Sequence, residues 1–132
     1  MLVGGCHCGL VRFTTAGTPF HETICHCADC RRVSGAASVA WFSIRRAEMS
    51  WTAGTPSAYR SSPGVVRRFC GACGTTFTFE DDRHPEEIDL ATATLDDPSA
   101  VPPKDHVFVS QAPTWDVPGD GLPAYRRSRR EG

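Results

Sequence analysis

A hairpin motif built around two cysteines lies at residues 65–80, which read VVRRFCGACGTTFTFE. The segment before the cysteines is rich in β-branched and aromatic residues, and the segment after them alternates with the period of a β-strand. Gly71 and Gly74 allow the backbone to curl so that its amides point at the sulfurs of Cys70 and Cys73. The motif therefore predicts a zinc knuckle within a β-hairpin.

All seven cysteines of the 132-residue chain fall into short clusters. The other two clusters are Cys6-His7-Cys8 and Cys25-His26-Cys27-Ala28-Asp29-Cys30. Such close thiolates suit a soft divalent metal better than disulfides, because two or three sulfurs can reach one ion without backbone strain. Seven cysteines fit one site with four thiolates and a second site with three. Three protein ligands leave a tetrahedral zinc with one open position, as in zinc sites that perform chemistry.

Side-chain alternation decides which cysteines can share an ion. Residues two apart on an extended segment point to one face, which pairs Cys6 with Cys8 and turns the histidine between them away. The same geometry pairs Cys25 with Cys27, and Cys30 lies at knuckle distance. We therefore expect two zinc ions per chain, a structural one on Cys6, Cys8, Cys70 and Cys73, and a second, catalytic one on Cys25, Cys27 and Cys30.

Two other interpretations of the second site remain open. A histidine, either His21, His84 or His106, could close it, and all seven cysteines would then serve folding alone. The segment from Cys27 to Cys30 also has the spacing of a redox motif. That chemistry needs a βαβ context that this sequence does not show.

Composition and charge exclude several classes of protein. The 14 Lys+Arg and 15 Asp+Glu residues give a net charge of -1, so no global basic field favours nucleic acid. No apolar stretch approaches the roughly 20 residues of a membrane span, and the N-terminus lacks the features of a signal peptide. We expect a cytoplasmic protein, where thiols stay reduced.

The secondary structure expected is a series of short strands. The 12 glycines and 10 prolines punctuate short apolar runs, which is typical of strands joined by turns. The only helical turn expected is at 28–33, ended after Ser34 by Gly35. The fold class expected is mainly β with little helix. Strands are expected at 10–14, 20–27, 36–44, 49–53, 65–69, 74–80, 87–94 and 106–110.

The cysteine motifs, with the residues around them, resemble those of the glutathione-dependent formaldehyde-activating enzyme family, also called S-(hydroxymethyl)glutathione synthases. The C-terminal segments 106–108 and 112–116 are similar to that family as well. The motifs that carry the resemblance are Gly4-Gly5-Cys6-His7-Cys8-Gly9, Cys25-His26-Cys27-Ala28-Asp29-Cys30-Arg31-Arg32-Val33-Ser34-Gly35 and Phe69-Cys70-Gly71-Ala72-Cys73-Gly74-Thr75.

The resemblance implies a β-tent fold of short antiparallel strands around a zinc knuckle. It implies a single zinc-binding domain over 1–123, followed by a basic tail over 124–132 that we expect to be frayed. The same division of zinc ligands follows from it. The implied activity joins formaldehyde to glutathione and is a carbon–sulfur lyase reaction in the reverse sense.

Several side chains are candidates for contact with such a substrate. Glutathione carries two carboxylates, so its site should offer arginine, and a pocket wall could be aromatic. His106 is a candidate proton donor, although a hydrogen-bonded structural role is the simpler interpretation. The other candidates are Arg31, Arg32, Arg67, Arg68, Trp41, Trp51 and Trp115.

Two functions therefore compete. The first is an enzyme acting on a small thiol such as glutathione and a small aldehyde such as formaldehyde. The second is a non-catalytic zinc module for protein interaction or for sensing thiols or metals. Three thiolates weaken the Lewis acidity of zinc and favour thiol exchange, which suits the enzyme. An open coordination position in a cleft favours the enzyme, and a fourth protein ligand favours the module.

Overall fold

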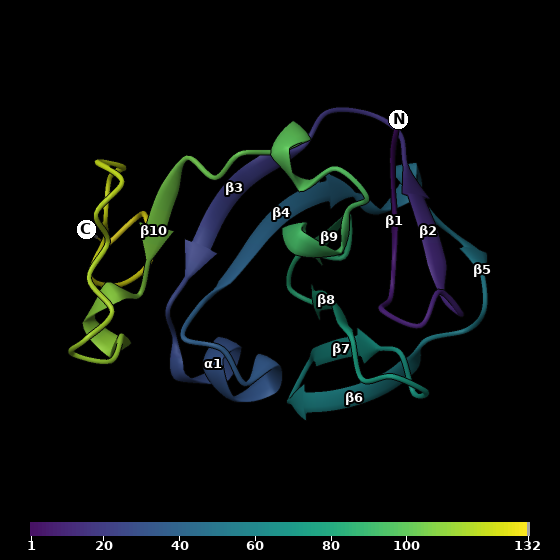
Figure 1. The fold of residues 1–132 in the computed structure, drawn as a ribbon, viewed down its shortest axis with the longest axis horizontal. Helices are drawn as coiled ribbons and strands as arrows, with labels where there is room; N and C mark the ends of the chain where they lie inside the picture. Colours follow the sequence, from purple (N-terminus) through teal and green to yellow (C-terminus); the bar gives the residue numbers. More distant parts are fainter. Residues whose placement is uncertain (132) are drawn as a thin grey trace.

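The structure, a computed structural model, describes residues 1–131, and Gly132 lies outside the described residues. Within them the chain forms mostly strands, with one short helix and four 3-10 turns (Figure 1). The prediction of a mainly β class with little helix is confirmed. The elements are β1 Leu2–Gly5, β2 Arg12–Thr15, β3 Phe20–Cys25, α1 Ala28–Ser34, β4 Val39–Arg45, η1 Arg46–Glu48, β5 Met49–Ala53, β6 Ser57–Ser62, β7 Val65–Phe69, β8 Thr76–Asp81, β9 Glu87–Ala91, η2 Thr92–Thr94, η3 Pro98–Ala100, β10 Asp105–Val107 and η4 Val109–Gln111.

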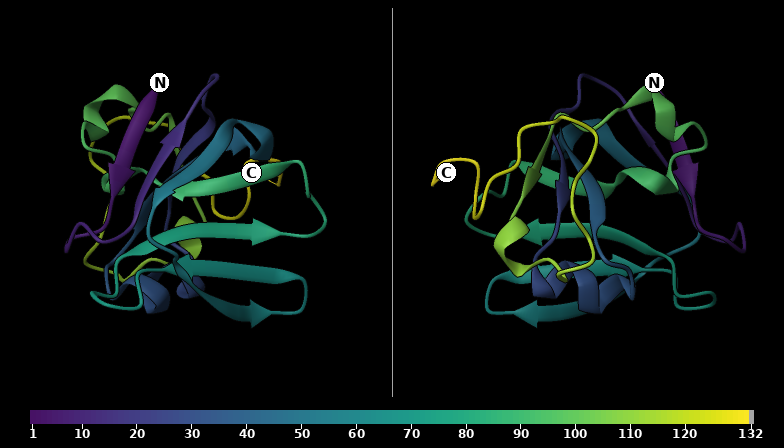
Figure 2. Two further views of the ribbon diagram at one scale, coloured as in Figure 1. Left: turned by 90° about the vertical axis from the view of Figure 1, so that its right-hand side faces the viewer. Right: turned by 60° about the vertical axis from the view of Figure 1, so that its left-hand side comes forward.

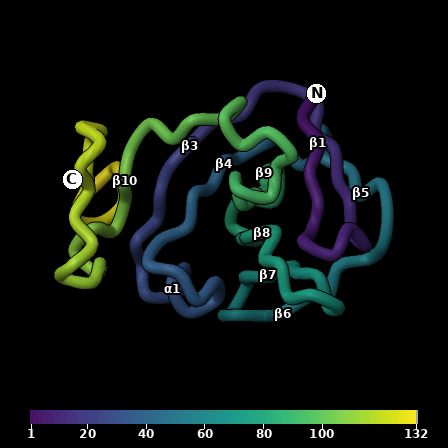
Figure 3. Tube along the Cα trace, viewed as in Figure 1, coloured from purple at the N-terminus to yellow at the C-terminus, as the bar shows by residue number. Residues whose placement is uncertain are grey.

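The strands form two sheets, which is the β-tent architecture that the resemblance implies. The small sheet has the order β1-β2-β5 and stands at one side of the molecule (Figure 1). The large sheet has the order β10-β3-β4-β9-β8-β7-β6 and curves from the C-terminal segment to the β6–β7 hairpin (Figures 2 and 3). Among the described strands, the pairings are antiparallel with one exception. β10 runs parallel to β3, because a long connection through η2 and η3 returns the chain to that edge.

The main hydrophobic core joins the two sheets. Phe13 of β2 meets Phe77 of β8 edge to face, with ring centroids 5.9 Å apart. Phe42 and Leu90, from adjacent strands of the large sheet, are fully buried in the same cluster. The cluster also contains Cys6 and Cys70. One of the cysteine clusters is therefore part of the main core.

The only α-helix among the described residues ends where the sequence predicts. Gly35 follows α1 with a φ of 67°, in the left-handed region that favours glycine, and its amide donates to the carbonyl of Arg31 at 2.7 Å. At the other end, the sulfur of Cys27 accepts a hydrogen bond from the amide of Cys30. The chain then enters β4. This short helix is not long or apolar enough to cross a membrane, and neither is any other helix in the described part of the chain.

Two strands were not predicted from the sequence. β6 is an edge strand of SAYRSS whose side chains are mostly exposed, so it shows no alternation between buried and exposed residues. β1 contains two glycines in four residues. One of them, Gly4, is needed because a Cβ there would lie 2.4 Å from the carbonyl oxygen of Thr94. Backbone pairing, rather than side-chain pattern, defines both strands.

The C-terminal segment, which the sequence predicts to be frayed, forms hydrogen bonds to β10 and η4 over its described residues. The amide of Tyr125 donates to His106 at 2.9 Å, and the amide of Phe108 donates to Arg127 at 3.0 Å. Arg129 forms an ion pair with Asp105. Main-chain hydrogen bonds provide most of these contacts, and they do not depend on side-chain type. Figure 2 shows the segment running alongside β10.

Candidate functional site

The first candidate metal centre consists of four thiols that two sheets bring together. Cys6 follows β1 of the small sheet, and Cys70 follows β7 of the large sheet. The sulfurs of Cys6 and Cys8 lie 3.5 Å apart, and those of Cys8 and Cys70 lie 3.8 Å apart. The fourth member, Cys73, lies within 4.8 Å of the others. The structure thus brings together the four residues predicted as structural ligands.

These distances fit a zinc ion. A tetrahedral zinc with bonds of about 2.3 Å places its sulfurs about 3.8 Å apart, whereas a disulfide needs about 2.05 Å. The backbone also stabilises thiolates here, because the amide of Val11 donates to the sulfur of Cys6 at 3.3 Å. The hydroxyl and amide of Thr75 lower the pKa of Cys73 to about 5. The donor set could therefore bind zinc and link the two sheets through it.

The second candidate centre is formed by three thiols around the start of α1. Cys25 ends β3, Cys27 caps the helix and Cys30 lies in its first turn. Their sulfurs all lie within 4.8 Å of one another. The thiols of Cys25 and Cys30, followed by the amides of Cys30 and Asp29, lower the pKa of Cys27 to about 2. This trio is the set predicted from spacing, and its geometry could also bind zinc.

A fourth protein ligand does not join this trio in the described part of the chain. The thiols form a group of their own, without a histidine or carboxylate at the same mutual distance. His84 lies in a separate and largely exposed group with Glu86 and Glu87. His106 uses both of its ring nitrogens elsewhere, on His26 and on Asp120. Of the three proposed histidine ligands, His21 and His84 reach only the lining of the adjacent cavity.

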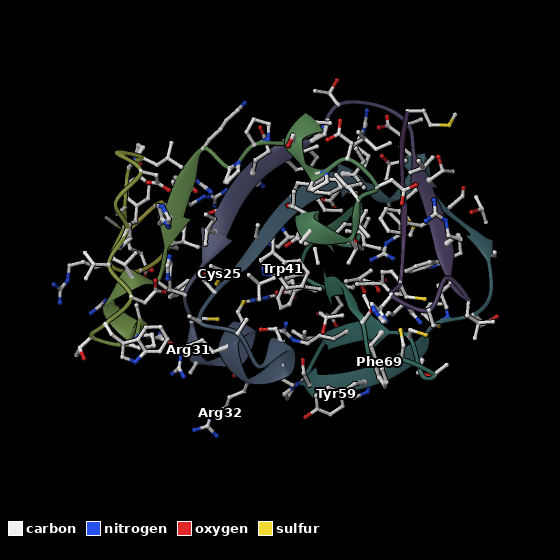
Figure 4. All side chains as sticks on the ribbon, viewed as in Figure 1. Cys25, Arg31, Arg32, Trp41, Tyr59 and Phe69 are labelled. Carbon is white, nitrogen blue, oxygen red and sulfur yellow. The ribbon has the colours of Figure 1, made fainter. Side chains whose placement is uncertain are left out.

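A cavity of about 530 Å³ opens beside the three thiols. Trp41 packs against Cys25 and Cys30 and forms part of its wall, as Figure 4 shows above α1. Strands β3, β4, β9, β8 and β7 each contribute a side chain from the same face of the large sheet. Other lining residues are Thr23, Ser43, Arg67, Phe79, Asp89, Ser128 and Arg129.

Two buried histidines contact each other next to the three-thiol segment, since His26 stands between Cys25 and Cys27 in the chain. His26, only 2% exposed, shares a hydrogen bond of 2.9 Å with His106, whose other nitrogen lies 2.9 Å from Asp120. The far nitrogen of His26 lies 3.4 Å from Asp116. Burial lowers the pKa of His26, which favours its neutral ring. The hydrogen bonds that join His26, His106 and Asp120 help to fix the segment between Cys25 and Cys27.

The tryptophans proposed as pocket walls have three different environments. Trp41 lines the cavity. Trp51 packs in the main core, 5.3 Å from the ring of Phe77. Trp115 is 76% exposed and does not line the cavity. Of the three tryptophans, Trp41 is therefore the one that could contact a substrate in the cavity.

The arginine candidates also differ. Arg67 lines the cavity, but Arg68 pairs with Glu80 at 2.8 Å. Arg32 extends from α1 toward the outside of the molecule in Figure 4, and Arg31, whose Nε atom is buried, does not line the cavity. Arg67 is thus the one candidate arginine that reaches the three-thiol cavity.

Several site residues were not predicted from the sequence. Asp116 and Asp120 reach the histidine pair from the C-terminal segment. Asp89 and Arg129 line the cavity from β9 and from the last residues. Asp89 and Asp120 stand in an ordinary strand pattern and in a loop, and no motif surrounds them. Asp116 belongs to segment 112–116, which resembles the family, but nothing in the sequence indicated that its side chain reaches the site. Only the tertiary pairing brings them to the site.

Asp89 has an unusual environment for a carboxyl group. Burial raises its pKa from the ordinary value of 3.8 to about 6, although the hydroxyl of Ser43 donates a hydrogen bond to it at 2.6 Å. Because the pKa is higher in the folded state, ionisation costs folding free energy. This cost is absent below about pH 4, grows as the pH rises toward 6 and is complete above it.

Replacing Asp89 by asparagine should therefore stabilise the protein at neutral pH. A shift of about two pKa units corresponds to at most about 3 kcal/mol in the free energy of unfolding. The gain should be smaller at pH 5 than at pH 7.5, as measured by urea unfolding. Asp82→Asn, at an exposed position, is the control, and its effect on the free energy of unfolding should not increase with pH. If the stabilisation by Asp89→Asn does not increase with pH either, the pKa of Asp89 is not raised in the folded protein.

Comparison with known proteins gives consistent similarities. A family model described as "Glutathione-dependent formaldehyde-activating enzyme" matches residues 1–111. A Halomonas elongata protein named "Putative glutathione-dependent formaldehyde-activating enzyme" is 30% identical over 125 residues, covering 87% of this chain and 79% of that protein. A solved Rhodobacter sphaeroides protein matches with a TM-score of 0.61 at 22% identity, covering 93% of this chain and 98% of the other. The last similarity concerns the fold alone.

Proposed function

This chain belongs to the glutathione-dependent formaldehyde-activating enzyme family, and we propose that it joins formaldehyde to glutathione at the cavity beside Cys25, Cys27 and Cys30. The observation that carries the proposal is the three-thiol cluster, which faces a cavity and lacks a fourth protein ligand among the described residues. A purely structural site would be expected to close its coordination shell with protein.

The proposal assigns one role to each cysteine cluster. Cys6, Cys8, Cys70 and Cys73 would hold a structural zinc between the sheets, and Cys25, Cys27 and Cys30 would hold the zinc used in the reaction. Zinc bound by three thiolates would offer its remaining position to the thiol of glutathione and favour the thiolate form of that sulfur. The free thiols of this chain suit a reducing compartment such as the cytoplasm.

The reaction itself needs little from the protein beyond positioning. The sulfur of glutathione forms a bond to the carbon of formaldehyde, and the C=O electron pair moves to oxygen. That oxygen takes the proton that the thiol has lost, which gives S-(hydroxymethyl)glutathione. In the cavity, the rings of Trp41 and Phe79 provide apolar walls that limit access of water to the sulfur. Holding the two reactants together is expected to supply most of the acceleration.

Exchange NMR tests this proposal directly. Glutathione and its formaldehyde adduct interconvert without a catalyst, and the zinc-loaded protein should raise the exchange rate at least about tenfold. With the Cys27→Ser variant, the exchange should proceed only at the uncatalysed rate. Exposed Trp115→Ala should retain the wild-type rate. Wild-type protein that leaves the exchange unchanged would contradict the proposal and favour a non-catalytic zinc module.

A further inference from the structure

Arg67 is a buried cation without an acidic partner. Its side chain lies on β7, and the residue is only 6% exposed. Its Nε donates to the hydroxyl of Ser61 at 3.3 Å, and its guanidinium carbon lies 4.9 Å from the centre of the Phe79 ring. The Nη1 atom is buried and has no hydrogen-bond partner among the described residues. The guanidinium group therefore retains unused capacity to donate hydrogen bonds.

The environment of Arg67 differs from that of the arginines that form ion pairs. Burial of an unpaired charge costs folding free energy, and a buried donor without an acceptor adds to that cost. Five more exposed arginines in the described chain have a carboxylate partner, whereas the more deeply buried Arg67 has none. They are Arg12, Arg46, Arg68, Arg83 and Arg129.

The register of the large sheet explains why Arg67 has no such partner. Arg67 stands opposite Phe79 on β8, and Phe79 stands opposite Asp89 on β9. The carboxyl group of Asp89 is therefore two strands, or about 10 Å, away from Arg67, and the ring of Phe79 lies between them. Asp89 accepts its hydrogen bond from Ser43 on the other side. The sheet thus keeps the guanidinium free.

Arg67 also lies between two cavities. It lines the cavity that contains the three thiols and a second one of about 500 Å³. Arg32 and Arg68 line the second cavity with Tyr59 and Phe69, and no carboxylate does so among the described residues. Figure 4 shows Arg32, Tyr59 and Phe69 below α1 and around β6 and β7. A substrate whose sulfur reaches the thiols could therefore place an anionic group on Arg67.

We propose that Arg67 binds a carboxylate of the thiol substrate and thereby selects acidic thiols over neutral or basic ones. A guanidinium binds a carboxylate through two parallel N–H donors, and the free Nη1 supplies one of them. The second cavity, with its further arginines, accommodates the remainder of the anionic part. This inference rests on the proposed function, because it concerns the same substrate.

Calorimetric titration of the zinc-loaded protein tests the inference. Arg67→Met keeps an unbranched side chain over Phe79 and removes the charge. It should weaken glutathione binding about 10- to 100-fold and leave the affinity for cysteamine, a thiol without a carboxylate, unchanged. Arg46→Met is the matched control, because Arg46 pairs with Glu80 and lines neither cavity. It should bind both thiols as the wild type does.

Thermal unfolding separates a binding role from a structural one. Without ligand, Arg67→Met should unfold at the wild-type temperature or higher, because it removes an unpaired buried charge. Arg46→Met should unfold at a lower temperature. A folded Arg67→Met protein with wild-type affinity for glutathione would overturn the inference and leave the proposed function intact. Loss of affinity for both thiols would also overturn it, since the effect would not depend on the carboxylate.

A simple dicarboxylate distinguishes failure of the inference from failure of the proposed function. If the wild-type protein does not bind glutathione, but succinate raises its unfolding temperature and that of Arg46→Met more than that of Arg67→Met, the carboxylate site stands and the proposed substrate is wrong. If succinate has the same effect on all three proteins and glutathione does not bind, both are wrong.

Discussion

Replacing Cys70 by serine is expected to unfold the protein. Cys70 is fully buried in the main core, and its sulfur lies 3.8 Å from that of Cys8. Loss of one thiolate from a four-thiolate zinc site removes most of the binding free energy, which is about 10–16 kcal/mol for structural zinc. A domain of this size has only about 5–15 kcal/mol of stability. The loss is therefore large enough to abolish the folded state.

Circular dichroism, together with the zinc content of the purified protein, measures this effect. Cys70→Ser should lack a cooperative thermal transition and retain no zinc in the four-thiol site. The exposed Trp115→Ala is the folded control. A Cys70→Ser protein with the wild-type unfolding temperature would show that the four thiols do not hold a structural metal.

Replacing Cys27 by serine is expected to have a different result, a folded protein with one zinc and no activity. Cys27 caps α1 by accepting a hydrogen bond from the amide of Cys30 at 3.3 Å. Serine is among the preferred residues at this position, so the cap should persist. The serine hydroxyl is a poor replacement for a thiolate ligand, however, because zinc sites of this kind depend on sulfur donors.

The comparison between the two serine variants is the informative one. Cys27→Ser should keep a cooperative thermal transition, bind one zinc fewer than the wild type, and lose the acceleration of adduct exchange. If Cys27→Ser unfolds as completely as Cys70→Ser, the assignment of separate structural and reactive roles is wrong.

Local spacing explains why the cysteine groups could be predicted from the sequence. Cys6 and Cys8, like Cys25 and Cys27, are only two residues apart, so their sulfurs can reach one ion. The expected extended geometry is absent, because Cys6 and Cys8 lie in the turn after β1 and Cys27 lies beyond the end of β3. The end of the helix at Gly35 was equally predictable, because its left-handed conformation favours glycine. Short-range geometry was sufficient for each of these features.

Features that depend on long-range pairing could not be predicted in this way. The C-terminal segment lines the cavity with Ser128 and Arg129 because its backbone pairs with the region around β10. Main-chain bonds of this kind leave little trace in the sequence. The isolation of Arg67 depends on the register that places Phe79 between it and Asp89. From sequence alone, Arg67 and Arg68 were equal candidates.

Native mass spectrometry of the zinc-loaded protein, before and after addition of glutathione, tests the central claim most directly. We expect two zinc ions per chain and one glutathione that binds the wild type. Cys27→Ser should carry one zinc and should bind glutathione more weakly. A wild-type chain that carries a single zinc and shows no response to glutathione would contradict the claim that the three thiols form a reactive metal centre.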